Sequence, residues 1–281
     1  MPGVHDALGA RLAEAAGFSA ITAGGYGATA TLLGRPDSSQ LSLTELSEMY
    51  SRLCDATPLP LLADADTGFG NVTNVVRAVR LYEKAGVAGL FIEDQVFPKR
   101  CGHMAGKAVV SRADWLAKIK AALDARVDPD MIIMARTDAL AVHGIDDAIE
   151  RAQLAREAGA DLLFVEAPTD VGEMRRICAE IPGPCLANNI ETGLSPLLSA
   201  DELQAIGYAA VVFPVAATYA VAYALRELFA TIRRTGSTAD FLPRLVAFGE
   251  FNELVGLPLQ RRRESEWMRD AEALVESHRK P

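Results

Sequence analysis

One short pattern occurs four times along this chain of 281 residues, and it restricts the fold more than any other feature. In each copy an amphipathic helical stretch ends at a small or apolar residue and a glycine, and a short apolar run follows. The copies occupy residues 13–24, 82–94, 155–167 and 203–214. Their glycines suit the left-handed conformation that closes a helix, and the apolar runs suit parallel strands buried on both faces. The repeated step from helix to strand predicts an α/β fold with a parallel sheet.

Further strand-like segments bring the count to about eight, which favours a barrel. The segments at 59–66, 131–138 and 184–189 have the same apolar character, and residues 2–8 supply the eighth. A doubly wound open sheet is the alternative, but no GxGxxG turn follows an early strand. We therefore expect one (β/α)8 TIM barrel domain over residues 1–281, with 225–281 forming mainly extra C-terminal helices.

Polar side chains follow the expected strands, at the end of a barrel where active sites lie. Asp64 and Asp66 are spaced to point the same way on one strand, and Glu93 supplies a carboxylate from the next. Loops often begin with polar residues, but this alternative does not account for acids at three strand ends and Arg136 at a fourth. Oxygen ligands of this kind predict a partly hydrated Mg²⁺ ion, with Mn²⁺ as a possible substitute.

The loop "KRCGHMAGK", residues 99–107, allows three interpretations. A zinc site is disfavoured because Cys101 and His103 have no second ligand pair at a useful spacing. A basic binding patch is disfavoured because the rest of the chain is acidic. A catalytic lid fits best: the neighbouring cations would lower the pKa of the Cys101 thiol, and the glycines would let the loop close. A buried, inert cysteine remains the plain alternative.

The composition excludes several classes of function. The net charge of −9 argues against nucleic-acid binding, which needs a cationic surface. The four cysteines form no CxxC pair, which suits a reducing compartment. No cationic leader and no apolar run of about 18 residues is present, so we expect a cytoplasmic protein that does not bind membranes.

Five motifs, taken in order, resemble the isocitrate lyase and phosphoenolpyruvate mutase superfamily over almost the whole chain. They read "LLADADTGFGN", "GLFIEDQV", "PKRCGH", "MARTDALAVHGIDDAIERA" and "LANNIETG". The resemblance implies a Mg²⁺-dependent barrel enzyme, commonly a homotetramer built as a dimer of dimers that exchange a C-terminal helix. Members normally have a helix and a full first strand before the motif at 2–8. The resemblance therefore also predicts either a misassigned start or an incompletely closed barrel.

The resemblance also assigns roles around the expected metal. Asp64 and Asp66 would hold Mg²⁺ directly or through water, with Asp37 and Glu93 further out. The backbone of Gly24, Gly25 and Tyr26, together with Arg136, would cradle the carboxylate and oxyanion of an α-keto acid.

A second set of roles concerns the loop and the far side of the substrate. Cys101 would be the general acid that protonates the carbanion released by cleavage, assisted by Lys99, His103 and Glu166. The remaining expected substrate contacts are Gly102, Asn188, Asn189, Ile190 and Glu191.

We therefore expect a carbon–carbon lyase that cleaves a substituted malate-type 2-hydroxy acid, such as 2-methylisocitrate or 2,3-dimethylmalate, to pyruvate or glyoxylate and a carboxylic acid. Tyr219 and Phe251 replace arginines of the tricarboxylate-cleaving branch, and Met104 stands where that branch usually has another, which favours an alkylmalate. Oxaloacetate decarboxylase or hydrolase chemistry and phosphonate chemistry remain alternatives. A barrel that binds a small molecule without catalysis is an alternative of another class.

Overall fold

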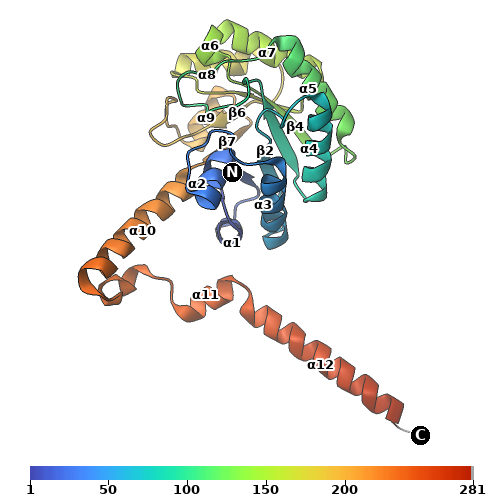
Figure 1. Cartoon of the computed structure of the whole chain (residues 1–281), viewed down its shortest axis with the longest axis vertical. Helices are drawn as coiled ribbons and strands as arrows, with labels where there is room; N and C mark the ends of the chain where they lie inside the picture. The colour runs from blue at the N-terminus through green and yellow to red at the C-terminus, as the bar shows by residue number, and fades with distance from the viewer. Residues whose placement is uncertain (280–281) are drawn as a thin grey trace. The chain divides into compact units, whose positions relative to one another are not determined.

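A computed structural model describes residues 1–279 and divides the chain into two compact units, Met1–Ala222 and Tyr223–Pro281. The first unit contains parallel strands surrounded by helices, as Figure 1 shows. Its strands are β1 Ile21–Ala23, β2 Leu61–Asp64, β3 Gly89–Glu93, β4 Ile132–Thr137, β5 Leu162–Val165, β6 Leu186–Asn188 and β7 Ala210–Val212. Strands β1 to β5 form one sheet in chain order, and β6 pairs with β7.

Single bridges join these sheets into a closed barrel. A parallel bridge between Leu163 and Cys185 connects β5 to the start of β6. On the other side, Pro2 bridges to Phe213 beyond β7, and Gly3 bridges to Thr22 in β1. Residues 1–3 therefore act as the eighth strand, within the segment 2–8 predicted for it, and the alternative of an incompletely closed barrel is wrong.

The closing segment runs close to the loop after β7, which explains the glycine within it. The amide of Gly3 donates to the Phe213 carbonyl at 2.9 Å, and the Thr22 amide donates to the Pro2 carbonyl at 3.0 Å. A Cβ atom on Gly3 would lie 2.2 Å from the carbonyl oxygen of Pro214. Glycine is therefore the residue that lets this short strand fit.

Helices alternate with the strands, as the repeated pattern predicts. They are α1 Ala7–Ala15, α2 Gly25–Leu33, α3 Leu43–Ala56, α4 Val72–Lys84, α5 Arg112–Ala125, α6 Leu140–His143, α7 Ile145–Glu157, α8 Val171–Glu180 and α9 Ala200–Ile206. The four glycines of the pattern, Gly17, Gly86, Gly159 and Gly207, all have positive φ. At the other end, α3, α4 and α9 each begin with a capping box, whose paired side chain and backbone bonds satisfy free amide groups.

The strands are buried on both faces, in two separate apolar clusters. The outward-facing side chains join the main core beneath the helices, whereas a smaller cluster fills the barrel interior. The interior cluster comprises Leu62, Phe91, Met134, Leu162, Phe164, Leu186 and Val212. Because side chains alternate along a strand, these residues form the apolar floor beneath the polar strand ends.

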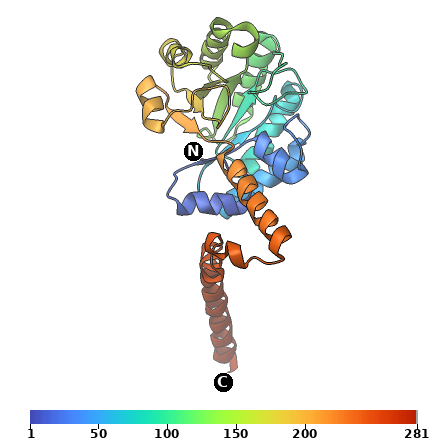
Figure 2. The same ribbon diagram turned by 90° about the vertical axis from the view of Figure 1, so that its left-hand side faces the viewer.

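The second unit is helical. Helix α10, Ala216–Thr235, begins in the first unit, and η1 Ala239–Arg244, α11 Phe248–Leu254 and α12 Leu257–Arg279 follow. Helix α12 is a single long rod in Figure 2. Within residues 1–279, no strand follows β7, and none of the helices is both long and apolar enough to cross a membrane.

Candidate active site

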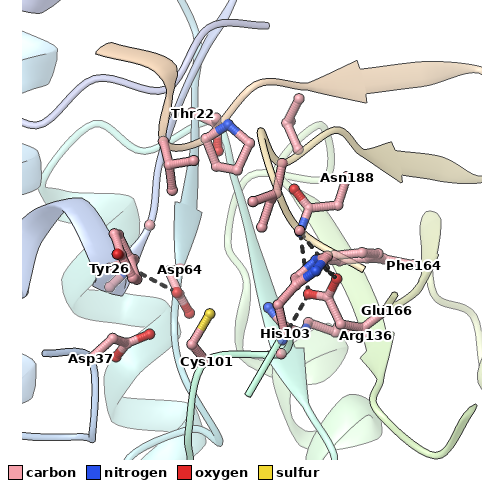
Figure 3. A pocket seen from close by; sticks show the side chains of 18 of the residues that line it. Thr22, Tyr26, Asp37, Asp64, Cys101, His103, Arg136, Phe164, Glu166 and Asn188 are labelled. Carbon is pink, nitrogen blue, oxygen red and sulfur yellow. Dashed lines mark hydrogen bonds and ion pairs between the residues drawn. The ribbon is translucent and has the colours of Figure 1, made fainter. Parts of the chain in front are cut away.

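A cavity of about 220 Å³ opens at the carboxyl ends of the barrel strands. Figure 3 shows Cys101 between two groups of polar side chains, one with Asp37 and Asp64 and the other with Arg136, Glu166 and His103. The predicted residues that line the cavity are Gly24, Gly25, Tyr26, Asp37, Asp64, Lys99, Cys101, Gly102, His103, Arg136, Glu166, Asn188, Ile190 and Glu191. One cavity therefore brings together most of the side chains singled out in the sequence.

Asp64, the last residue of β2, is held rigidly. Its Oδ2 accepts the amide of Gly25 at 2.9 Å, and its Oδ1 accepts the amide of Asp66 at 2.8 Å. The hydroxyls of Tyr50 and Tyr82 each donate to its backbone carbonyl at 3.0 Å. These bonds fix the carboxylate at the cavity wall, where it can face a cation or a substrate.

Lys99 enters the acidic group from the loop. Its ammonium donates to Oδ2 of Asp37 at 2.9 Å and lies 2.9 Å from Oδ1 of Asp66. Burial alone would lower the pKa of Lys99, but the carboxylates, Asp66 and Asp64 foremost, raise it well above its ordinary value. Lys99 is therefore a fixed positive charge in this structure, not a proton donor.

Two of the predicted metal residues, Asp66 and Glu93, are buried but do not line the cavity. The expected strand alternation fails because β2 ends at Asp64 and Asp66 adopts a left-handed conformation, with φ of 46°. Burial, together with the neighbouring acids, raises the pKa of Asp66 to about 6 and that of Glu93 well above its ordinary value. Keeping both carboxylates ionised therefore costs free energy unless a further cation lies nearby.

The oxygen atoms here fit a hydrated divalent ion. Glu93 Oε1 is buried and accepts no hydrogen bond from any described residue, while Asp66 Oδ1 has only the ammonium of Lys99 at 2.9 Å and Glu93 Oε2 only Nε of Arg136 at 3.3 Å. The water shell of a Mg²⁺ ion would supply the missing donors. Among residues 1–279, no three acidic, imidazole or thiol groups converge as direct metal ligands. The residues therefore fit an ion held largely through water, with substrate completing its shell.

Arg136, near the end of β4, is the centre of the second group. Its guanidinium lies 3.0 Å from Asp138 Oδ2 and 2.9 Å from Glu166 Oε2, with the ring centroids of Phe91 and Phe164 at 5.8 and 5.1 Å. Burial alone would raise the pKa of Glu166, but Arg136 and His103 outweigh it and hold the pKa at about 2. Arg136 and Glu166 therefore form a permanently charged pair in an apolar frame.

The hydrogen bonds of His103 determine its tautomer. Its Nδ1 accepts the backbone amide of Leu194 at 2.9 Å, so Nε2 carries the hydrogen and donates to Glu166 Oε1 at 3.1 Å. Asn188 donates to the same Glu166 oxygen at 3.1 Å, and its own Oδ1 is buried with no partner among residues 1–279. The Asn188 oxygen is therefore free to accept a bond from substrate.

Cys101 keeps its proton in this environment. Burial, together with the charge of Glu166, raises the pKa of the thiol above its ordinary value. The prediction of a lowered pKa is wrong because the neighbouring cations point elsewhere: Lys99 to the acidic group, and Arg100 to the Ala105 carbonyl at 3.3 Å. A protonated thiol suits a general acid, not a nucleophile.

Two other outcomes differ from the sequence prediction. Asn189 turns away from the cavity and binds the backbone of Leu198, with its Nδ2 2.6 Å from the Leu198 carbonyl, so its role is to hold the loop after β6.

The sequence prediction missed Phe91 and Phe164. Each phenylalanine lies two residues before an acid, Glu93 or Glu166. Because side chains two apart share one face of a strand, this spacing could have predicted both rings inside the barrel.

Comparisons with known proteins agree with this geometry. The chain is 48% identical to the 2,3-dimethylmalate lyase of Eubacterium barkeri over 91% of this chain and 89% of that protein. It is 42% identical to the 2-methylisocitrate lyase of Aeropyrum pernix over 99% of this chain and 89% of that protein.

Solved structures show the same fold. A crystal structure of 2,3-dimethylmalate lyase matches with a TM-score of 0.90 and 35% identity, covering 94% of this chain and 89% of that one. A phosphonopyruvate hydrolase complex with oxalate and Mg²⁺ matches with a TM-score of 0.85 and 33% identity, covering 95% and 93%. The family model described as phosphoenolpyruvate phosphomutase matches residues 1–233. This chain therefore belongs to the phosphoenolpyruvate phosphomutase family, and its relatives named above include lyases.

Proposed function

We propose that this enzyme is a Mg²⁺-dependent lyase that cleaves a 2-hydroxy acid of the substituted malate type to an α-keto acid and a carboxylic acid. The observation that carries the proposal is the position of the Cys101 thiol, between an acidic group that fits a cation and the paired cation Arg136. Lyases acting on 2,3-dimethylmalate and 2-methylisocitrate are among its relatives.

The reaction assigns a task to each group. A carboxylate of the acidic group that lines the cavity, Asp37 or Asp64, takes the proton of the substrate hydroxyl, the bond between carbons 2 and 3 breaks, and its electron pair passes to the departing acid as an enolate. Cys101 then gives its proton to that enolate. Arg136 and the backbone amides near Gly25 orient the keto acid, while Asn188 and His103 face the departing acid. Mg²⁺, held at Asp64 with Asp37, Asp66 and Glu93 behind it, would supply positive charge to the hydroxy-acid oxygens.

The cavity favours an alkyl-substituted dicarboxylate over a tricarboxylate. Among the described lining residues, the Lys and Arg side chains are Lys99 and Arg136, and both already contact carboxylates. Tyr219, Ile190 and Val215 make the nearby wall largely apolar. Phe251 lies in α11 of the second unit, so its proposed contribution to the substrate wall stays a prediction.

A panel of 2-hydroxy di- and tricarboxylates tests the proposal, with keto-acid release coupled to a dehydrogenase and with Mg²⁺ present or removed. We expect an alkylmalate to give the highest kcat/KM, and no turnover without a divalent ion. The Cys101→Ser variant should lose at least about 10³-fold in kcat and still bind Mg²⁺ and pyruvate, because serine is a much weaker acid than the thiol. Normal turnover by this variant would overturn the assignment of Cys101.

The same metal-binding and keto-acid-binding residues are also compatible with a reaction of oxaloacetate that takes no proton from Cys101. Pyruvate or oxalate formation from oxaloacetate that persists in Cys101→Ser would favour this second activity over cleavage of an alkylmalate.

We also propose that the second unit packs on another copy of the chain, within a homotetramer. Its apolar side chains support this, since Phe248 is 87% and Phe229 60% exposed in the single chain. Light scattering on the full chain should give the mass of four copies. A monomer at micromolar concentration would contradict the proposal.

A further inference from the structure

Two buried charges beside the cavity have no role in the reaction described above. The ammonium of Lys107 lies 2.9 Å from Oδ1 of Asp138, and the two side chains are 3% and 0% exposed. Lys107 ends the catalytic loop, and Asp138 follows β4 directly. A buried pair of this kind costs desolvation energy, which makes a contribution to stability alone a poor explanation for it.

Lys107 also reaches across the loop to its tip. Its ammonium donates to the carbonyl of Gly102, the residue after Cys101. The base of the loop is fixed by backbone bonds, since the amide of Val96 donates to the Ala108 carbonyl at 2.8 Å, and that of Val110 to the Asp94 carbonyl at 2.8 Å. Lys107 therefore connects the fixed base of the loop to its tip.

The position of Gly102 controls the position of Cys101. The Gly102 backbone packs so closely on the cavity wall that an added Cβ would lie 2.4 Å from Glu166 Cγ and 2.5 Å from a terminal nitrogen of Arg136. A shift of the tip away from this wall would carry the thiol out of the cavity.

Asp138 is a rigid anchor for this contact. Its backbone amide donates to Asp94 Oδ1 at 2.8 Å, and Asp94 in turn accepts from the Thr137 hydroxyl at 2.6 Å and from Arg151 at 3.2 Å. The same Asp138 carboxylate accepts from Nε of Arg136 at 3.0 Å. One carboxylate therefore holds both the substrate-facing guanidinium and the lysine that holds the loop.

We propose that Lys107 is a positioning residue that, through Asp138 and the Gly102 carbonyl, latches the loop over the cavity and places Cys101 opposite Arg136. The kinetic consequence rests on the proposed lyase function, whereas the latch itself does not. The latch links loop closure to Arg136 because both depend on Asp138.

The first test measures access to the thiol and requires no substrate. The Lys107→Met variant keeps an unbranched side chain of similar length and removes the ammonium. We expect iodoacetamide to alkylate Cys101 about tenfold faster in this variant than in the wild type, as measured by mass spectrometry of the Cys101 peptide. Lys84→Met, at an exposed position in α4, is the matched control and should behave as wild type. Lys107→Arg should restore most of the protection.

An unchanged rate at Cys101 in Lys107→Met would overturn the latch. A rate increase of equal size at Cys54 and Cys178 would overturn it too, because this would indicate general loosening of the fold.

The second test uses turnover of the best substrate. Lys107→Met should lower kcat about 10- to 100-fold and change KM less than about threefold, because a misplaced proton donor slows chemistry more than binding. A rise in KM with unchanged kcat would contradict a positioning role. If no 2-hydroxy acid is cleaved by the wild type, the proposed function fails, but the alkylation test still decides the latch.

Discussion

The two sides of the cavity differ in how far their buried carboxylates are paired with positive charges and hydrogen-bond donors. On one side, Asp37 and Asp66 both contact the ammonium of Lys99, and among the described residues the buried Oε1 of Glu93 has no donor. On the other side, Glu166 accepts from Arg136, His103 and Asn188, so its carboxylate is fully paired. The pKa values follow this difference: about 6 for Asp66, raised by burial, and about 2 for Glu166, where the partners outweigh burial. The first side, which we name the acidic side, fits an added cation, and the second, the paired side, is already complete.

The acidic side should therefore respond to charge removal most strongly. Asp64→Asn keeps one oxygen for a backbone amide but removes the charge that faces the cation. We expect kcat to fall at least about 10³-fold, because both metal binding and charge stabilisation depend on this residue. Calorimetry should show weaker Mg²⁺ binding, and Asp124→Asn on the exposed face of α5 should change neither quantity. If Asp64→Asn kept more than a tenth of the activity, the acidic side would not be the metal side.

The paired side should lose substrate binding without losing the metal. Arg136→Lys keeps a positive charge but cannot contact Asp138 and Glu166 while it faces the substrate carboxylate, since an ammonium has no planar fork. We expect kcat/KM to fall about 100-fold and the affinity for Mg²⁺ to change less than about threefold. Titrations with pyruvate and with Mg²⁺ separate these effects. Equal losses in both would show that the two sides are not independent.

The sequence predicted the fold well because the fold depends on a repeated local signal. The glycines of the repeated pattern close helices, and the apolar runs become strands whose ends meet in one cavity. The sequence predicts the barrel but leaves its complete closure open, because single bridges at Pro2 and Gly3 leave no periodic pattern to detect.

The finer geometry of the site could not be predicted in the same way. The spacing of Asp64 and Asp66 predicts two side chains on one face of a strand, whereas Asp66 lies beyond the end of β2 in a left-handed conformation and does not line the cavity. The prediction of a lowered thiol pKa fails because Lys99 and Arg100, which flank Cys101 in sequence, contact other groups in space. The direction in which Lys99 points depends on tertiary contacts with Asp37 and Asp66, which no local pattern encodes.

The contribution of the paired side to the free energy of unfolding should depend on pH, and this effect should be smaller than the two above. The pKa of Glu166 is about 2 in the fold and about 4.3 in an unfolded chain, so its pairing stabilises the fold fully above pH 4.3. That contribution is lost as the pH falls toward 2. Glu166→Gln should therefore lower the free energy of unfolding by about 3 kcal/mol at pH 7, and the deficit should shrink below pH 4.3. Urea titrations measure it, with exposed Glu157→Gln as control. A deficit that did not depend on pH would point to lost packing instead.

Tyr219 should give the smallest effect, because its hydroxyl bonds the hydroxyl of Tyr26 and not a charged group. Its hydroxyl donates to the Tyr26 hydroxyl at a long 3.4 Å, while the two rings pack edge to face with centroids 6.2 Å apart. Tyr219→Phe removes the weak bond and keeps the ring, so kcat/KM for an alkylmalate should change less than about threefold. Tyr219→Ala removes the ring and should cost about tenfold, since an apolar contact of this size contributes more than 1 kcal/mol. If the Phe variant lost as much as the Ala variant, the hydroxyl would matter more than the apolar wall, and the preference for an alkyl substituent would need another cause.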